Sequence, residues 1–296
     1  MRNVSVLSFS FEAENIEKIL SDTDILELIA DNLNGTEDLV LLPELCLGNA
    51  INEMGDVFLS GIAALARENK TYILASVNRK MTDTTHVNSA ILFDRTGEVA
   101  FCYDKMYPYW GEFDRTDSKI LPGKRAVFAD TDFGRVSAAI CFDANFPDLW
   151  QQIADLDVEL VIFSSAYSAG RQLCAHALNH HYAIVTSTRK PDFAVYDIDG
   201  KETTYTRLSR EQILISRTRI DLDKVICHHN FNLDKISQML RDHPGKIELE
   251  HYYDREEWIV IRSTSPEINA TELCKKYGIE TLRDYKRRSK ETNCEK

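Results

Sequence analysis

The chain has 296 residues, of which 44% are hydrophobic and 28% are charged, and its formal net charge is −12. This composition is typical of a globular protein with a sizeable core, and it excludes a disordered chain. The negative charge implies no general affinity for nucleic acids or anionic membranes, so we expect neither as a partner.

No apolar run approaches the ~18 residues that a membrane-spanning helix needs. The first residues, MRNVSVLSFSF, contain one arginine and an apolar run interrupted by serine, which is typical of a first strand rather than a signal peptide. Seven cysteines are scattered along the chain without a close pair. The odd count and the scatter favour reduced thiols in a cytoplasmic protein.

Strands and helices alternate in the first part of the chain. The pattern predicts a strand over 3–9 and a helix over 15–33, where apolar residues recur at helical spacing. A short strand over 38–42 is wholly apolar, as in a sheet covered on both faces. It runs directly into Glu44, and a carboxylate at the end of a buried strand is costly unless it is paired or functional.

The middle of the chain indicates hairpins and further strands. Residues 88–94 and 98–104 form a predicted hairpin, and its second strand ends at Lys105. The next segment, MYPYWGEFD, surrounds Glu112 with aromatic residues, as in loops that line pockets. Other predicted elements are helices over 57–70 and 170–181, and strands over 71–77, 126–129, 135–140, 158–164, 182–188, 193–198, 201–206 and 212–219. The hairpins exclude an all-parallel sheet, so one mixed α/β domain is the simplest architecture.

The pattern loosens after Asp221 into predicted helical pieces, a short strand over 257–262 and a charged tail. We therefore divide the chain into a catalytic domain, residues 1–265, and a C-terminal helical tail, residues 266–296. Three apolar tail residues have little to cover in a monomer, so the tail is a possible oligomer contact. They are Ile268, Leu273 and Leu282.

The segment VSAAICFDANFPDLW reads as a strand, a bend and a helix, with Cys141 at the bend. Asn145 can cap the helix and Pro147 suits its first turn. A thiol near a helix N-terminus tends to have a lowered pKa, which makes it a better nucleophile. A small buried cysteine that ends a core strand is the alternative, and it is the commoner case for an isolated cysteine.

Three predicted strands thus end in a reactive side chain, namely Glu44, Lys105 and Cys141. Strand ends at one edge of a sheet are where α/β enzymes build their sites. The three residue types suit one reaction. A cysteine attacks a carbonyl or nitrile carbon, a carboxylate transfers protons, and an ammonium or a backbone N–H stabilises the oxyanion.

These motifs resemble the nitrilase, or carbon–nitrogen hydrolase, superfamily. LVLLPEL resembles the family's strand with its glutamate, and YDKMYPYWGEFD resembles its lysine segment with a second glutamate. LPGKRAVFADTDFGRVSAAICFDANFPD resembles its PG…fG…ICfD..FP signature in order and spacing. The resemblance extends to about Asp221. It implies a single-domain, four-layer α-β-β-α sandwich, a homodimer or higher homo-oligomer, and no metal or organic cofactor.

The resemblance also implies roles for four residues. Glu44 would be the general base and acid, Lys105 the oxyanion stabiliser, Cys141 the nucleophile and Glu112 a supporting glutamate. The implied function is a cysteine-dependent hydrolase that cleaves a non-peptide C–N bond of a small molecule. The substrate would be an amide or an N-carbamoyl compound, less so a nitrile, and a thioester intermediate would release ammonia or an amine.

The substrate pocket is expected to carry aromatic and polar side chains. Many relatives have an arginine in the elbow after the cysteine, where this chain has Ala144-Asn145, so the resemblance indicates a reaction type rather than a substrate. Arg171, which opens a predicted helix just beyond a strand, could bind a substrate carboxylate or could simply face solvent. The expected pocket residues are Tyr107, Tyr109, Trp110, Phe142, Asn145, Tyr167 and Arg171.

Other readings of the sequence stay open. Residues 166–170 approximate the G-x-S-x-G elbow of serine hydrolases around Ser168, although the first glycine is missing. His176 and His180 have the i, i+4 spacing of helical metal ligands but lack an obvious third ligand. A non-catalytic binding protein on the same fold is the remaining alternative, because a fold does not determine a function.

Overall fold

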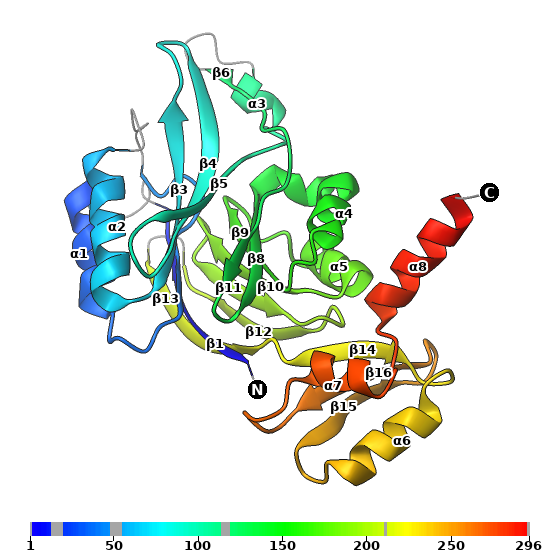
Figure 1. Cartoon of the computed structure of the whole chain (residues 1–296). Helices are drawn as coiled ribbons and strands as arrows, with labels where there is room; N and C mark the ends of the chain where they lie inside the picture. The colour runs from blue at the N-terminus through cyan, green and yellow to red at the C-terminus, as the bar shows by residue number, and fades with distance from the viewer. Residues whose placement is uncertain (1, 13–19, 48–54, 114–118, 210–211, 295–296) are drawn as a thin grey trace.

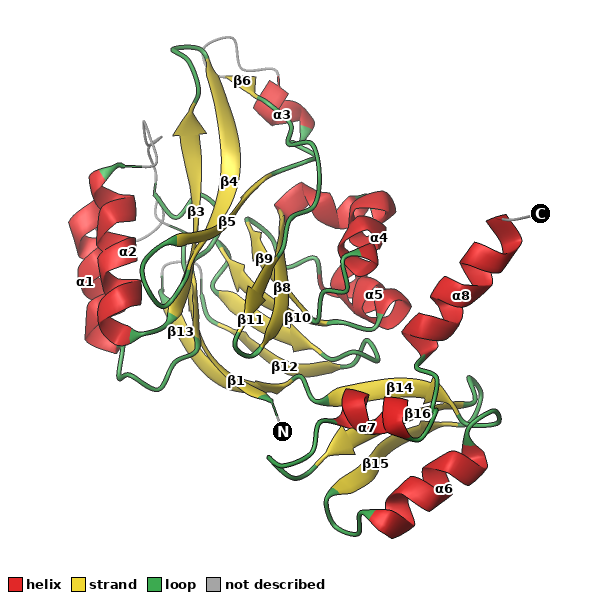
Figure 2. Cartoon of the chain, in the orientation of Figure 1, coloured by secondary structure: helices red, strands yellow, loops and turns green. Residues whose placement is uncertain are grey.

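The computed structural model describes residues 2–12, 20–47, 55–113, 119–209 and 212–294. Two large sheets face each other, and a third, small sheet lies beyond one end of this pair (Figures 1 and 2). In the described part of the chain, no helix is both long and apolar enough to cross a membrane.

The first sheet has the strand order β13-β1-β2-β3-β4-β5, with β6 beside β4. β1, β2 and β3 are parallel to one another, whereas β3, β4 and β5 form an antiparallel meander. Its strands are β1 (Asn3–Ser10), β2 (Leu39–Leu41), β3 (Tyr72–Lys80), β4 (Thr85–Phe93), β5 (Val99–Asp104), β6 (Lys119–Ile120) and β13 (Leu214–Asp221).

The second sheet has the strand order β12-β11-β10-β9-β8-β7. Its central strands β8, β9 and β10 are parallel, so their carboxyl ends lie at one edge. Its strands are β7 (Ala129–Thr131), β8 (Gly134–Ile140), β9 (Leu160–Ser165), β10 (Ala183–Thr188), β11 (Asp192–Tyr196) and β12 (Glu202–Arg207).

Helices cover the outer face of each sheet (Figure 2). α1 (Asp22–Asn32) and α2 (Val57–Asn69) pack on the first sheet, and α4 (Pro147–Asp155) and α5 (Gly170–His180) pack on the second. The short strand β2 shows why its sequence is wholly apolar. Leu39 and Leu41 point into the core between the sheets, while Val40 and Leu42 point into the core beneath α1 and α2. The predicted four-layer α-β-β-α sandwich is confirmed.

Serine side chains join the two sheets where they face each other. Ser8 in β1 donates to the Thr186 carbonyl at 3.0 Å, and Ser187 in β10 donates to the Phe9 carbonyl at 2.6 Å. Ser164 in β9 donates to the Leu42 carbonyl at 3.0 Å, two residues before Glu44. Because these hydroxyls are buried and bonded, they set the register of one sheet against the other.

One predicted helix begins later than expected. α1 starts at Asp22, because Ser21 and Asp24 form a reciprocal capping box around its first turn. The earlier part of the predicted helix over 15–33 falls mostly outside the described residues. The predicted strands and hairpins between residues 3 and 221 otherwise match observed elements to within a few residues.

The chain after Asp221 contains more strand than its sequence pattern indicates. β14 (Lys224–His228), β16 (Trp258–Ser263) and β15 (Ile247–Tyr253) form the small antiparallel sheet, with α6 (Leu233–Asp242), α7 (Ala270–Lys276) and α8 (Leu282–Cys294). Only the strand near β16 was expected. The predicted boundary at residue 265 stays a prediction, although α7 shares an apolar core with β14 and β16.

The prediction that the apolar residues of the C-terminal tail have little to cover in a monomer is wrong. Leu273 is buried, and Ile268 packs against the same apolar cluster as β14 and α6. Leu282 is also buried, against Ile226 and Val260 of the small sheet. These side chains therefore complete a core within the chain and give no support for a partner.

Candidate active site

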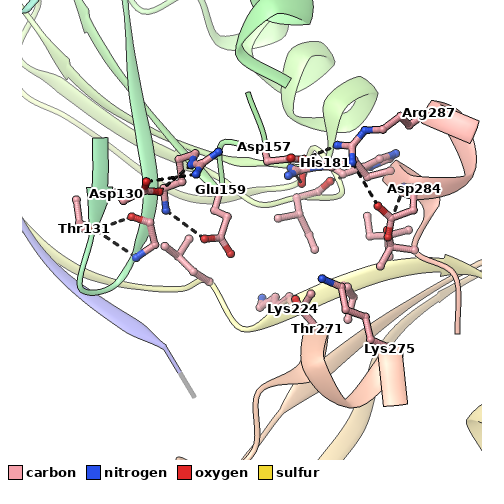
Figure 3. Close-up of a pocket in the computed structure, with 18 residues that line it drawn as sticks. Asp130, Thr131, Asp157, Glu159, His181, Lys224, Thr271, Lys275, Asp284 and Arg287 are labelled. Carbon is pink, nitrogen blue, oxygen red and sulfur yellow. Dashed lines mark hydrogen bonds and ion pairs between the residues drawn. The ribbon is translucent and has the colours of Figure 1, made fainter. Parts of the chain in front are cut away.

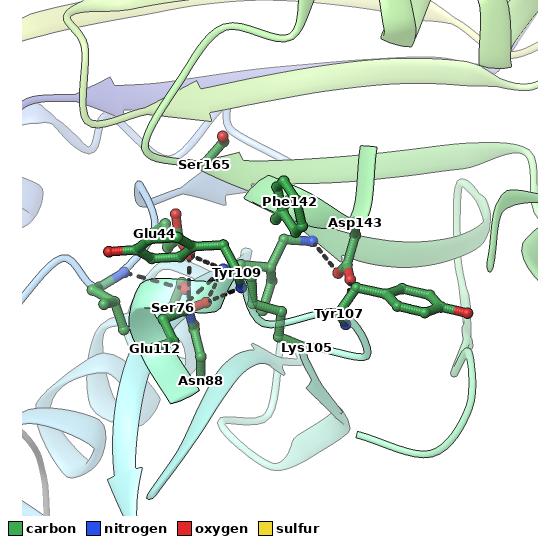
Figure 4. A network of polar contacts seen from close by, with 12 residues as sticks. Glu44, Ser76, Asn88, Lys105, Tyr107, Tyr109, Glu112, Phe142, Asp143 and Ser165 are labelled. Atoms are coloured by element: carbon green, nitrogen blue, oxygen red, sulfur yellow. Dashed lines mark hydrogen bonds and ion pairs between the residues drawn. The ribbon is translucent and has the colours of Figure 1, made fainter. Parts of the chain in front are cut away.

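Three strand ends from the two facing sheets meet in one cavity of about 670 Å³. Glu44 follows β2 and Lys105 follows β5, both in the first sheet, while Cys141 follows β8 in the second. Figure 4 shows Glu44, Lys105 and Glu112 converging beside Phe142. The sequence had indicated these side chains separately, and the sandwich brings them together.

Lys105 forms a buried ion-pair cluster with the two glutamates. Its ammonium lies 2.9 Å from Glu44 Oε1 and 3.0 Å from Glu112 Oε2. Burial alone would lower the pKa of Lys105, but the charges of the carboxylates of Glu44 and Glu112 outweigh it, and the pKa is raised. The lysine therefore stays cationic, as an oxyanion-stabilising group must.

The two oxygens of Glu44 have different surroundings. Oε1 accepts from Lys105 and, at 2.7 Å, from the amide of Asn88, which also donates to Glu112 at 3.4 Å. Oε2 is buried and has no hydrogen bond of standard geometry to any described residue. The Cys141 thiol lies near enough for its pKa to depend on Glu44. One oxygen thus orients the carboxylate while the other is available for proton transfer.

Cys141 sits at a sharp bend in the backbone. Its φ of 49° lies in the left-handed region, which costs a non-glycine residue about 1–3 kcal/mol and is typical of functional turns. A single turn of 3₁₀ helix, Cys141–Asn145, separates β8 from α4. This turn aims the side chain of Cys141 into the cavity rather than along the sheet.

The thiol does not have the lowered pKa that its sequence context suggested. Burial, followed by the charge of Glu44, raises the pKa of Cys141 to about 12, although Lys105 and the Ala166 N–H act in the opposite direction. The physical reason is position, because α4 begins only at Pro147 and the sulfur instead lies beside a carboxylate. The thiol is therefore protonated at neutral pH and needs a base when it attacks.

Five of the seven predicted pocket residues line the cavity and two do not. Tyr109, Trp110, Phe142, Asn145 and Tyr167 line it. The expectation for Tyr107 is wrong, because its hydroxyl bonds to Asp148 and its ring stacks on Phe146 at 3.8 Å. The expectation for Arg171 is also wrong, because it is exposed on the first turn of α5 and its neighbour Gln172 faces the cavity instead.

Several lining residues were missed by sequence reasoning. Gln172 donates to Asn145 Oδ1 at 2.6 Å, which forms a neutral polar wall that no local pattern reveals. Arg189 follows β10, and its position beyond a third parallel strand of the same sheet was a usable signal. The missed residues are Leu45, Asn78, Ile120, Ala166, Gln172 and Arg189.

The residues that suggested a serine hydrolase or a metal site form other contacts. Ser168 hydrogen-bonds to Asp192 and does not line the cavity. His176 bonds to the Ala144 carbonyl at 2.9 Å and stacks on Trp150. Among the described residues, no three His, Cys, Asp or Glu side chains are grouped closely enough to hold a metal ion.

A second cavity, of about 510 Å³, lies away from this site and is lined by parts of β7, β8, β14, α7 and α8 (Figure 3). Many of its charged side chains pair with one another. Arg287 bonds to Asp157 and lies 3.7 Å from Asp284, and Arg135 lies 2.8 Å from Asp130. Of these pairs, Arg287–Asp157 joins α8 to the sandwich, whereas Arg287–Asp284 lies within α8 and Arg135–Asp130 lies within the β7–β8 hairpin.

Comparisons with known proteins bear on the family and the fold of this chain. A family model described as carbon-nitrogen hydrolase matches residues 13–188, more than half of the chain. Deaminated glutathione amidase from Yersinia enterocolitica is 30% identical over 87 residues, which are 27% of this chain and 30% of that protein. The matched segments span less than half the length of the curated relatives.

Solved structures share the fold at low identity. Carbon-nitrogen hydrolase from Helicobacter pylori gives a TM-score of 0.64 at 17% identity, covering 82% of this chain and 96% of that one. A mutant amidase from Nesterenkonia sp., solved with a covalent acetamide moiety at its active site cysteine, gives 0.59 at 17% identity, covering 73% and 89%. With the family match over residues 13–188, the conclusion is that this chain belongs to the carbon–nitrogen hydrolase family.

Proposed function

We propose that the protein is a cysteine-dependent hydrolase of small-molecule amides or N-carbamoyl compounds. The observation that supports this most is the presence of Glu44, Lys105 and Cys141 in one cavity, with Glu112 bonded to the lysine. A protonated thiol beside a carboxylate and an ammonium is the set of groups that acyl transfer through a thioester requires.

In the first half of the reaction, Glu44 takes the proton from the Cys141 thiol as the sulfur attacks the carbonyl carbon. The C=O pair of electrons moves to oxygen, and the Lys105 ammonium with the Phe142 N–H stabilises that oxyanion. The tetrahedral intermediate then collapses and the C–N bond breaks. Glu44 returns the proton to the departing nitrogen, so ammonia or an amine leaves and a thioester remains.

In the second half, Glu44 removes a proton from water as the water oxygen attacks the thioester. The same oxyanion donors stabilise the second tetrahedral intermediate. The C–S bond breaks, the acid or carbamic acid leaves, and the proton passes from Glu44 to the sulfur. The cycle uses no oxidant, reductant or metal, and each proton begins and ends on a named group.

An amide is favoured over a nitrile by the relatives' names. The curated relatives include a deaminated glutathione amidase and a formamidase from Bradyrhizobium sp., and the Nesterenkonia protein is an amidase. The cavity offers aromatic rings from Tyr109 and Trp110 and a neutral wall from Asn145 and Gln172. Such a lining suits a small polar substrate with an apolar portion.

A substrate panel tests this proposal. Purified protein would be incubated with aliphatic and aromatic amides, N-carbamoyl amines and nitriles, and release of ammonia or amine would be measured. We expect turnover of at least one amide or carbamoyl compound and none by Cys141→Ala. Turnover that survives in a folded Cys141→Ala variant would contradict the proposal.

Two further expectations concern assembly, which rests on the family resemblance, and location, which rests on the cysteines. We expect a homodimer or a larger homo-oligomer, which light scattering at micromolar concentration would show as a multiple of 33.9 kDa. We also expect a cytoplasmic protein. Six described cysteines are free thiols, and this supports a reducing compartment.

A further inference from the structure

Asp143 is a fully buried carboxylate two residues beyond the candidate nucleophile. Its Oδ2 accepts the Ile140 N–H at 2.9 Å and the Tyr103 hydroxyl at 2.7 Å, and its Oδ1 accepts the Tyr107 N–H at 2.9 Å. Within the described parts of the chain, no basic side chain forms an ion pair with it. A buried charge held by three neutral donors is costly, and such an arrangement points to a specific role.

The three donors come from the two segments that carry Lys105 and Cys141. Tyr103 and Tyr107 lie on either side of Lys105, and Ile140 directly precedes Cys141. Two hydrogen bonds join residues 103–107 to residues 140–145, and the Asp143 carboxylate accepts both of them. Figure 4 shows Asp143 and Tyr107 lying beside each other.

The two segments have no shared strand ladder to hold them together. β5, which leads to Lys105, belongs to the first sheet, and β8, which leads to Cys141, belongs to the second. The bond from Ile140 also closes the turn at Cys141, where the backbone is in the left-handed region. The distance between the Lys105 ammonium and an oxyanion formed at Cys141 therefore depends on this bridge.

We propose that Asp143 is a positioning residue that holds the lysine segment against the cysteine elbow, so that Lys105 and the Phe142 N–H converge on the oxyanion. This inference rests on the proposed function, since it concerns the same site. When a hydrogen-bond donor is displaced by about 1 Å from the developing negative charge, the rate falls by about a hundredfold, although substrate binding changes little. Asp143 itself does not line the cavity and need not touch the substrate.

The test compares Asp143→Asn with Asp148→Asn. The second variant makes the same chemical change on an exposed carboxylate that bonds only to the Tyr107 hydroxyl among described residues. An amide at position 143 has one acceptor oxygen and presents an N–H to donors, so it cannot keep all three bonds. We expect Asp143→Asn to lower kcat by about tenfold to a hundredfold with KM nearly unchanged, and Asp148→Asn to leave both unchanged.

Alkylation of Cys141 by iodoacetamide separates positioning from general damage. Alkylation develops no oxyanion, so it does not use the oxyanion site formed by Lys105 and the Phe142 N–H, and Lys105 affects it only through the pKa of Cys141. The proposal predicts a wild-type alkylation rate and an unchanged circular dichroism spectrum in Asp143→Asn despite the lower kcat. A parallel fall of kcat, alkylation rate and Tm would overturn it in favour of a purely structural role, and so would a wild-type kcat.

Tyr103→Phe keeps the proposal falsifiable if Asp143→Asn fails to fold. It removes only the hydroxyl that donates to Asp143, and we expect kcat to fall several-fold. In the double variant the two losses should not add, because both act through one bridge. The proposed function is checked separately in the same series. If alkylated wild-type enzyme still turns over substrate, the nucleophile assignment fails whatever the Asp143 variants do.

Discussion

The Lys105 ammonium lies within 3.0 Å of both Glu44 and Glu112, although all three side chains are nearly excluded from solvent. Removing charges from water is expensive, and this cost is offset only while the cluster is complete. One cation thereby orients the candidate base and the supporting glutamate while it remains near the cysteine. We therefore expect stability and catalysis to be coupled at Lys105.

Lys105→Met should damage both properties. We expect kcat to fall by about a hundredfold or more, because an oxyanion donor is lost. We also expect the free energy of unfolding to fall by about 3 kcal/mol, because two carboxylates are left buried and unpaired. Steady-state kinetics and urea unfolding measure the two effects. Lys80→Met is the matched control, since Lys80 pairs with the exposed Asp83 and should change neither quantity appreciably.

Ser168→Ala should be nearly silent. The Ser168 hydroxyl bonds to Asp192 outside the active cavity, so the substitution removes one local hydrogen bond and no reacting group. We expect kcat/KM within about twofold of the wild type and a loss of stability of about 1 kcal/mol. A serine hydrolase would instead lose activity by several orders of magnitude, and that result would revive the rival interpretation.

The sequence identified the three main residues of the candidate site because each of them ends a predicted strand. Glu44, Lys105 and Cys141 each follow a recognisable apolar run, but Glu44 and Lys105 follow strands of the first sheet and Cys141 follows a strand of the second. The wholly apolar β2 likewise indicated a sheet covered on both faces. What the pattern could not show was the pairing of two sheets through buried serines such as Ser164.

Other features depend on contacts that local patterns do not record. Successive residues on a helix point about 100° apart, so the start of α5 decides whether Arg171 or Gln172 faces the cavity. β15 alternates Ile247, Leu249 and His251, but its charged neighbours hid it as a strand. The raised pKa of Cys141 follows from burial and then from the approach of Glu44 from the other sheet, and sequence spacing predicts neither.

Arg189, not Arg171, should govern any preference for anionic substrates. Arg189 lines the cavity and lies 3.7 Å from Glu12, whereas Arg171 is exposed. For a carboxylated amide and its neutral counterpart, we expect Arg189→Met to raise KM more for the carboxylated compound, by about tenfold. Arg171→Met should leave the ratio of the two KM values unchanged. Equal effects of both arginine variants on that ratio would refute the assignment.

His181 should make stability depend on pH. Burial and the Lys286 charge lower the pKa of His181 to about 3, while the Lys286 ammonium lies 2.8 Å from Nε2. The unfolded chain, with an ordinary pKa, binds more protons between these values, so the free energy of unfolding falls as pH falls below about 6.5. The contribution is complete above that pH and is lost progressively toward pH 3.

The matched variant is His181→Asn, which cannot titrate in this range. Between pH 7 and pH 5, wild-type protein should lose about 2 kcal/mol more than the variant, because pH 5 lies about 1.5 units below the ordinary histidine pKa and still above the folded one. Urea unfolding at both pH values measures this difference. Identical pH dependence in the two proteins would contradict this prediction. It would show that the His181 imidazole, which lies beside Lys286 of α8, does not make the free energy of unfolding depend on pH.

The most direct test of the account is mass spectrometry of the enzyme caught during turnover. Wild-type protein would be mixed with an amide substrate found in the panel, quenched in acid and mapped by peptide. The account predicts an added acyl group on the peptide that contains Cys141, absent from Cys141→Ala and lost as substrate is consumed. An acyl group on another residue, or turnover by folded Cys141→Ala at the wild-type rate, would contradict it.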